Sequence, residues 1–350
     1  MRRWVRAAQE LRSAGGVSLL PLLLPLLLHG CATPPPVPLA DGVVTLATTP
    51  LSPPAADGFV PPMVRDPSGT MVGWLDLRYA ASEGVAPAEQ SLDLIAPAAV
   101  ESERGTAERG RPIVVFVHGG GWRRGEKRGF LERRAPAFTS AGFLLATINY
   151  RLAPAATHPA QISDTAAALA WLREHAAQFG GDPDALFVMG HSAGAHLAAL
   201  LSVDPRWLGE HDLPLSALRG AILLDGASYD VAARAGDVEG AAALIAHAFG
   251  SDPAVWADAS PLNHVAAGRG TPPCLLIVAG KNPDSGEDAA LLSAKLREAG
   301  GRADVVTFPD KTHVAISREL GLPGDGPTAA ILEFLSAVSG RPFSPPPAPR

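Results

Sequence analysis

Between residues 72 and 338 the chain alternates short apolar runs with longer stretches of helical periodicity. Runs such as 113–117 and 274–278 lack polar alternation, which is typical of strands covered by helices on both faces. The predicted strands cover residues 72–79, 91–95, 113–117, 143–150, 186–189, 221–224, 274–278 and 305–308. The predicted helices cover residues 162–177, 193–201, 288–299 and 328–338. This order predicts a mostly parallel, doubly wound sheet of about eight strands, whose first two strands form an antiparallel hairpin at the edge.

The N-terminal segment has the pattern of an export signal. Basic residues precede an apolar run at 17–28, which is too short for a membrane-spanning helix of about 20 residues. Leu28-His29-Gly30-Cys31 then resembles a bacterial lipobox. The resemblance implies that residues 1–30 are a lipoprotein signal peptide and that Cys31 is the lipidation site. The alternative is an ordinary signal peptide that is cleaved near Ala32.

Two proline-rich segments flank the predicted globular domain. Residues 31–70 combine proline clusters with small side chains, which is typical of an extended tether, and 341–350 form a similar tail. The globular domain therefore extends over 71–340. Within it, the long segment 225–273 is expected to form a helical wall beside the functional site.

Charge and cysteine content exclude several classes of partner. The formal net charge of −6 would fall to −9 once residues 1–30, with four arginines and one glutamate, are removed. An acidic chain without a basic stripe predicts no nucleic-acid partner. Cys31 and Cys274 are the two cysteines, so no disulfide is expected if Cys31 carries lipid. No metal site and no cofactor motif are readable.

The pentapeptide Gly190-His191-Ser192-Ala193-Gly194 has the form G-x-S-x-G. It follows a predicted strand and opens a predicted helix, which is the context of a nucleophilic serine on a sharp strand-to-helix turn. Small flanking residues allow the close backbone approach that this turn needs. The sequence therefore predicts Ser192 as a nucleophile.

A glycine-rich loop, His118-Gly119-Gly120-Gly121-Trp122, follows the strand at 113–117. Consecutive glycines let backbone N–H groups converge on one point, as the stabilisation of an oxyanion requires. The expected donors are the N–H groups of Gly120, Gly121 and Ala193, the residue after the nucleophile.

Four motifs stand in a familiar order and resemble the esterase and lipase branch of the α/β hydrolases. This branch includes hormone-sensitive-lipase-like and kynurenine-formamidase-like enzymes. The resemblance covers residues 91–334 and implies an α/β-hydrolase fold with a catalytic domain at 71–340. The motifs are His118-Gly-Gly-Gly-Trp122, Asn149-Tyr-Arg-Leu-Ala-Pro154, Gly181-Asp-Pro-Asp184 and Gly190-His-Ser-Ala-Gly194.

The general base is predicted from chain order. In this fold the triad runs serine, acid, histidine, and the histidine follows the last strand. His313 comes directly after the strand at 305–308, whereas the other histidines of the domain precede the segment expected to hold the acid. His196, one turn after Ser192, is interpreted as a packed helix residue.

The acid is expected after the strand at 274–278. Relatives place an aspartate three residues after the glycine or directly before a proline, but Pro283 and Asn282 occupy those positions here. Asp284 is the nearest carboxylate and is the predicted acid. Glu287 and Asp288 stay open as alternatives.

These residues predict a carboxylesterase-type serine hydrolase that cleaves small acyl esters through an acyl-enzyme. Two alternatives stay open: an amidase of the same fold, such as an arylformamidase or a peptidase, and a catalytically silent binding protein. The lipobox implies an exported enzyme, anchored by lipid at Cys31 to a bacterial membrane, and Ala32 favours the outer membrane. The oligomeric state stays open.

Overall fold

The computed structural model describes residues 63–98, 110–237 and 239–340. The predicted signal peptide, Cys31, most of the predicted tether and the proline-rich tail lie outside these residues.

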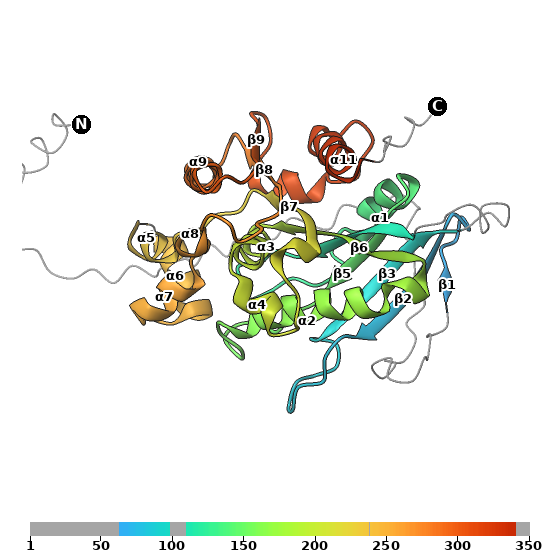
Figure 1. Cartoon of the computed structure of the whole chain (residues 1–350), viewed down its shortest axis with the longest axis horizontal. Helices are drawn as coiled ribbons and strands as arrows, with labels where there is room; N and C mark the ends of the chain where they lie inside the picture. Colours follow the sequence, from blue (N-terminus) through green and yellow to red (C-terminus); the bar gives the residue numbers. More distant parts are fainter. Residues whose placement is uncertain (1–62, 99–109, 238, 341–350) are drawn as a thin grey trace, which may run out of the picture. The chain divides into compact units, whose positions relative to one another are not determined.

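A single nine-stranded sheet forms the centre of the domain, in the order β1-β2-β3-β5-β4-β6-β7-β8-β9 (Figure 1). The strands are β1 (Val64–Arg65), β2 (Met71–Arg78), β3 (Ser91–Pro97), β4 (Arg111–Val117), β5 (Leu144–Ile148), β6 (Gly181–His191), β7 (Leu218–Leu224), β8 (Cys274–Ala279) and β9 (Ala303–Phe308). The pairs β1–β2, β2–β3 and β3–β5 are antiparallel, and all pairs from β5 to β9 in this order are parallel. The fold is that of an α/β hydrolase, and the predicted antiparallel hairpin is confirmed.

The sheet begins earlier than predicted. Strand β1 lies within 31–70, the segment assigned to the tether, because Val64 and Arg65 pair with Gly73 and Val72 of β2. The hairpin formed by β2 and β3 is therefore not the outermost part of the sheet, because β1 pairs with the free edge of β2. With β1, the sheet has nine strands in the described residues rather than about eight.

Helices cover both faces of the sheet (Figure 1). They are α1 (Leu131–Ser140), α2 (Ala160–His175), α3 (Ala193–Val203), α4 (Pro205–Gly209), α5 (Val231–Asp237), α6 (Glu239–Phe249), α7 (Pro253–Ala259), α8 (Pro261–His264), α9 (Pro283–Glu298), α10 (His313–Arg318) and α11 (Gly326–Ser339). Helices α1 and α11 pack on one face, and α2, α3 and α9 pack on the other. None of the helices in the described ranges is long and apolar enough to cross a membrane.

The continuous apolar strands contribute side chains to two hydrophobic cores, one on each face of the sheet. In β4, Val115 and Val117 join the core under α2 and α3, whereas Val114 and Phe116 join the core under α1 and α11. Successive side chains of a strand point to opposite faces, so a strand buried on both sides carries no polar alternation.

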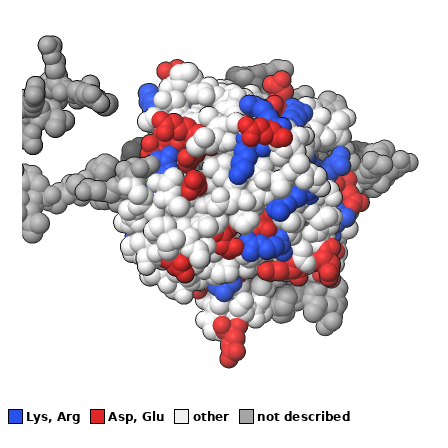
Figure 2. Space-filling view, turned by 60° about the vertical axis from the view of Figure 1, so that its left-hand side comes forward, with Lys and Arg blue, Asp and Glu red and all other residues white. Residues whose placement is uncertain are grey.

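The carboxyl ends of the central strands meet at one edge. The register pairs Val117 of β4 with Gly190 of β6, and His191 with Leu224 of β7. In open parallel sheets, loops at this edge hold the functional residues. The expected wall over 225–273 is formed by α5 to α8 (Figure 1). On the face drawn in Figure 2, basic and acidic side chains are interspersed, with no large area of one sign.

A buried ion network fixes the chain between the glycine-rich loop and α1. Lys127 lies 2.6 Å from Asp76 and 3.0 Å from Asp93, and Arg128 lies 2.6 Å from Asp93. The side chain of Asp93 is fully buried in β3. Removing one partner of a buried ion pair leaves a charge without compensation.

We therefore expect Asp93→Asn to lower the free energy of unfolding by about 3 kcal/mol. The matched control is Asp304→Asn, which breaks an exposed pair with Arg302 and should cost less than about 1 kcal/mol. Urea denaturation of both variants measures the difference. Equal losses would show that the buried network does not stabilise the fold.

Candidate active site

Strand β6 passes directly into helix α3 through a strained turn at Ser192. The backbone of Ser192 has φ 55° and ψ −120°, a conformation that residues other than glycine rarely adopt. The turn needs glycines on both sides: a Cβ at Gly190 would lie 2.1 Å from the carbonyl oxygen of Gly194, and one at Gly194 would lie 2.2 Å from that of Val117. Ser192 donates its backbone N–H to Leu224 at 3.0 Å. The sharp turn predicted from the sequence is present.

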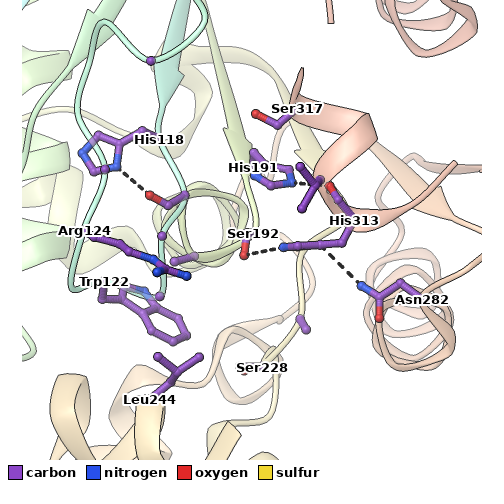
Figure 3. A pocket seen from close by; sticks show the side chains of 18 of the residues that line it. His118, Trp122, Arg124, His191, Ser192, Ser228, Leu244, Asn282, His313 and Ser317 are labelled. Carbon is purple, nitrogen blue, oxygen red and sulfur yellow. Dashed lines mark hydrogen bonds between the residues drawn. The ribbon is translucent and has the colours of Figure 1, made fainter. Parts of the chain in front are cut away.

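His313 begins α10 and faces Ser192 (Figure 3). Its Nε2 lies 3.0 Å from Oγ of Ser192, and its Nδ1 lies 2.6 Å from Oδ2 of Asp225. A carboxylate only accepts, so Nδ1 carries the hydrogen and Nε2 is left to accept from the hydroxyl. The side chain of His313 is 40% exposed and that of Asp225 is fully buried.

Asp225 follows β7 and receives hydrogen bonds from four groups. Besides His313, the donors are the backbone N–H of Ala279 at 2.7 Å, Nδ2 of Asn282 at 2.8 Å, and the hydroxyl of Ser285. Burial opposes the charged form, but the bonds from His313, Asn282, Ser285 and Ala279 together hold the pKa of Asp225 below its ordinary value. The carboxylate is therefore ionised at neutral pH.

The structure does not bring Asp284, the acid predicted from the sequence, to His313. Helix α9 starts at Pro283, five residues before the predicted start at 288, so Asp284 lies in its first turn. The carboxylate lies 3.3 Å from Arg234, and its side chain is 52% exposed. The partner of His313 is Asp225, and the prediction of Asp284 was wrong.

The two alternative carboxylates are also placed elsewhere. Asp288 accepts the backbone N–H of Ser228 at 2.6 Å and pairs with Arg234 at 3.4 Å. Glu287 is exposed on α9.

The sequence contained one signal for Asp225. It is a carboxylate directly after a predicted parallel strand, at 221–224, and such positions meet at the functional edge of the sheet. The expected chain order of serine, acid and histidine also holds for Asp225.

The glycine-rich loop lies beside Ser192. A Cβ on Gly119 would come within 3.1 Å of Cβ of Ser192, and Gly120 and Gly121 have φ of 118° and 61°. Among the described residues, the N–H groups of Gly120, Gly121 and Ala193 have no hydrogen-bond acceptor. All three residues line the same pocket as Ser192 and His313.

The motif at 149–154 supports this loop from behind. Tyr150 stacks on His118 at 4.3 Å between ring centroids and donates its hydroxyl to the carbonyl oxygen of His118 at 3.0 Å. Asn149 accepts the backbone N–H of Lys127 at 2.7 Å. The carbonyl of Trp122 accepts the N–H of Ala153 at 2.8 Å. The motif therefore holds both ends of the glycine-rich loop.

A pocket of about 1060 Å³ contains Ser192 and His313 (Figure 3). Leu244 of α6 bounds one side, close enough that a Cβ on Gly121 would lie 2.8 Å from its Cδ2. The prediction that the segment 225–273 forms a wall of the site is confirmed.

The other two histidines near the nucleophile are buried. Burial lowers the pKa of His191 and of His196 to about 3, so both are neutral. His191 lies 3.0 Å from the carbonyl oxygen of His313, which it helps to hold in place. His196 binds the carbonyl of Ala259 and packs against Trp122. It is therefore a packed helix residue, as predicted from the sequence.

In the described part of the chain, no group of three or more His, Cys, Asp or Glu side chains could hold a metal ion. Cys274, in β8, is a free, buried thiol whose pKa is raised by burial to about 12.

A strained serine between β6 and α3, facing a histidine after β9, defines the chain as an α/β hydrolase. Residues 100–208 match the family model described as BD-FAE. A solved structure described as a truncated form of carbohydrate esterase from gut microbiota has a TM-score of 0.63 and 21% identity, and the match covers 77% of this chain and 96% of that one. At this identity the likeness shows the fold alone.

Sequence relatives lie in the esterase and lipase branch. Esterase LipQ of Mycobacterium tuberculosis is 30% identical over 243 residues, which cover 67% of this chain and 57% of LipQ. Carboxylesterase NlhH of the same organism is 39% identical over 102 residues, which cover 28% of this chain and 31% of NlhH. The chain thus spans somewhat over half the length of LipQ and under a third of NlhH. The resemblance to this branch that the motifs indicated is confirmed.

Proposed function

We propose that the chain is a carboxylesterase-type serine hydrolase whose catalytic triad is Ser192, His313 and Asp225. The observation that carries the proposal is the continuous hydrogen-bonded chain from the serine hydroxyl through the imidazole to a buried carboxylate. The names of the relatives, an esterase and a carboxylesterase, support ester substrates.

In the proposed reaction, His313 Nε2 takes the proton of Ser192 while Oγ attacks the acyl carbon of an ester. Asp225 stabilises the imidazolium that forms and keeps Nδ1 protonated. Collapse of the tetrahedral intermediate breaks the ester bond, and the imidazolium gives its proton to the leaving alcohol. Water, activated by the same imidazole, then hydrolyses the acyl-enzyme.

The N–H groups of Gly120, Gly121 and Ala193, which have no acceptor in the described part of the chain, supply the proposed oxyanion hole. Unpaired donors that converge beside the nucleophile stabilise negative charge on the carbonyl oxygen, and removal of one such donor typically costs about 10²–10³-fold in kcat. Leu244 lies against Gly121 of this loop and lines the same pocket.

A carboxylate at His313 counts against a catalytically silent scaffold. A silent scaffold stayed open because no carboxylate stands at the expected position after β8. Asp225, which follows the neighbouring strand β7, supplies the acid instead.

Ser192→Ala should abolish hydrolysis of p-nitrophenyl acetate and labelling by a fluorophosphonate, because both need the nucleophilic oxygen. Mass spectrometry of the labelled wild-type protein should place the adduct on Ser192. Normal turnover by the variant, or an adduct on another serine, would refute the proposed nucleophile.

Asp225→Asn should lower kcat by roughly 10⁴-fold, because an amide at this position no longer holds the imidazole in the productive tautomer. The matched control is Asp284→Asn, also a pocket-lining carboxylate, which should change kcat by less than about twofold because it does not contact His313. Steady-state kinetics on p-nitrophenyl acetate measures both variants. A large loss in the control with little effect at Asp225 would return the acid to Asp284.

We also propose that the enzyme is an exported lipoprotein, attached through Cys31 to the outer membrane. The lipobox-like sequence at 28–31, the apolar run before it and the proline-rich segment after it support this location. Several acyl chains hold a protein on a bilayer far more firmly than one does.

Cys31→Ser should move the enzyme from the membrane fraction to the soluble fraction of the expressing cells. Esterase activity in each fraction reports the distribution, and mass spectrometry of the mature N-terminus reports the lipid. A wild-type protein that is wholly soluble, with an unmodified N-terminus, would refute the anchor and leave the proposed chemistry intact.

A further inference from the structure

The pocket around Ser192 carries more basic than acidic side chains, although the whole chain has 29 basic and 35 acidic residues. Its basic residues are Arg124, Arg134, Arg234 and Lys281, and its carboxylates are Glu126 and Asp284.

Two of these arginines have partners within the protein. Arg234 pairs with Asp284 and Asp288. Arg134 is buried, lies 3.8 Å from the ring centroid of Phe116, and donates to Ser317 and to the carbonyl of Gly129. Burial lowers the pKa of Arg134 to about 9, so the guanidinium is still charged at neutral pH, and among the described residues no carboxylate lies within ion-pair distance of it.

Arg124 is free to bind a ligand. Arg124 follows the glycine-rich loop by two residues, and Figure 3 shows its side chain extending toward the part of the pocket that holds Ser192. A Cβ on Gly120 would lie 3.0 Å from Cγ of Arg124. The aliphatic part of the Arg124 side chain therefore packs against Gly120, a residue of the proposed oxyanion hole. Within the described ranges, the guanidinium of Arg124 makes no ion pair or hydrogen bond, and it is not paired with Glu126 two residues later. Lys281 also lines the pocket, and its ammonium group makes no ion pair or hydrogen bond to any residue that the structure describes.

We propose that Arg124 binds a carboxylate group of the substrate, so that the preferred substrates are esters that carry a free carboxylate near the scissile bond. This inference rests on the proposed esterase function and names the substrate class of the same site. The planar guanidinium matches a carboxylate with two parallel hydrogen bonds, and Lys281 adds a second positive charge to the pocket.

Two pairs of probes test the inference, one for each side of the ester. 4-Acetoxybenzoate and 4-acetoxybenzamide differ in charge on the alcohol side, and monoethyl succinate and ethyl succinamate differ in charge on the acyl side. The variants are Arg124→Gln and, as matched control, Arg123→Gln. Arg123 is an exposed neighbour of the same charge that does not line the pocket. The readout is the ratio of kcat/KM for the charged probe to that for its amide.

For at least one pair the wild-type ratio should exceed one, and Arg124→Gln should lower it by about fivefold, the effect of roughly one partly exposed charge pair. Arg123→Gln should leave the ratio within about twofold, and 1 M NaCl should reduce the wild-type preference because salt screens exposed charges. Equal changes in both variants, or a preference for the amide probe in both pairs, would overturn the inference. Hydrolysis of p-nitrophenyl acetate but of none of the four probes would also overturn the inference, whereas absence of hydrolysis of all five esters would refute the proposed function.

Discussion

The hydrogen bond between His313 and Asp225 depends on the order of the strands in the sheet. The three residues of the site follow the carboxyl ends of three strands: Ser192 follows β6, Asp225 follows β7 and His313 follows β9. Only β8 lies between β7 and β9 in the sheet. The paired registers of these strands bring their ends to one edge, so the site is assembled from loops that start side by side. Any change that shifts one strand along its neighbour would separate the imidazole from the carboxylate.

The glycine-rich loop depends on a second set of contacts that never reach the reacting atoms. The three glycines give this loop its shape, but they also leave its centre without side chains, so that contacts at its two ends must hold it. Tyr150 and Ala153 supply that support through hydrogen bonds to His118 and Trp122, the two ends of the loop, and Asn149 holds Lys127 just beyond it. Lys127 continues the support into the β2–β3 hairpin through its buried ion pairs. The antiparallel edge of the sheet thus contributes to the geometry around Ser192.

The strands and Ser192 could be predicted because each depends on a local pattern, and His313 could be predicted from its order in the chain after the last strand. Continuous apolar runs identify buried strands, and a serine between glycines identifies the turn. The acid could not be assigned in this way. Asp225 and Asp284 each follow a strand end, and the choice between them depends on where α9 begins. Pro283 occupies the first turn, where proline is favoured, and this starts the helix early and directs Asp284 to Arg234. The sequence prediction had relied on the usual place of the acid in relatives.

Asn282 occupies the segment after β8, where the acid is expected from the sequence, and it still lies beside His313. Its Nδ2 lies 2.8 Å from Asp225 and 3.5 Å from Nδ1 of His313. Side chains that follow two adjacent strands, β7 and β8, therefore both lie next to Nδ1 of His313. A lineage that carried carboxylates at both positions could lose either one and keep a partner for the histidine, without any rearrangement of the backbone. Column-by-column alignment would then report a missing acid in proteins whose catalytic group has moved one strand along the sheet.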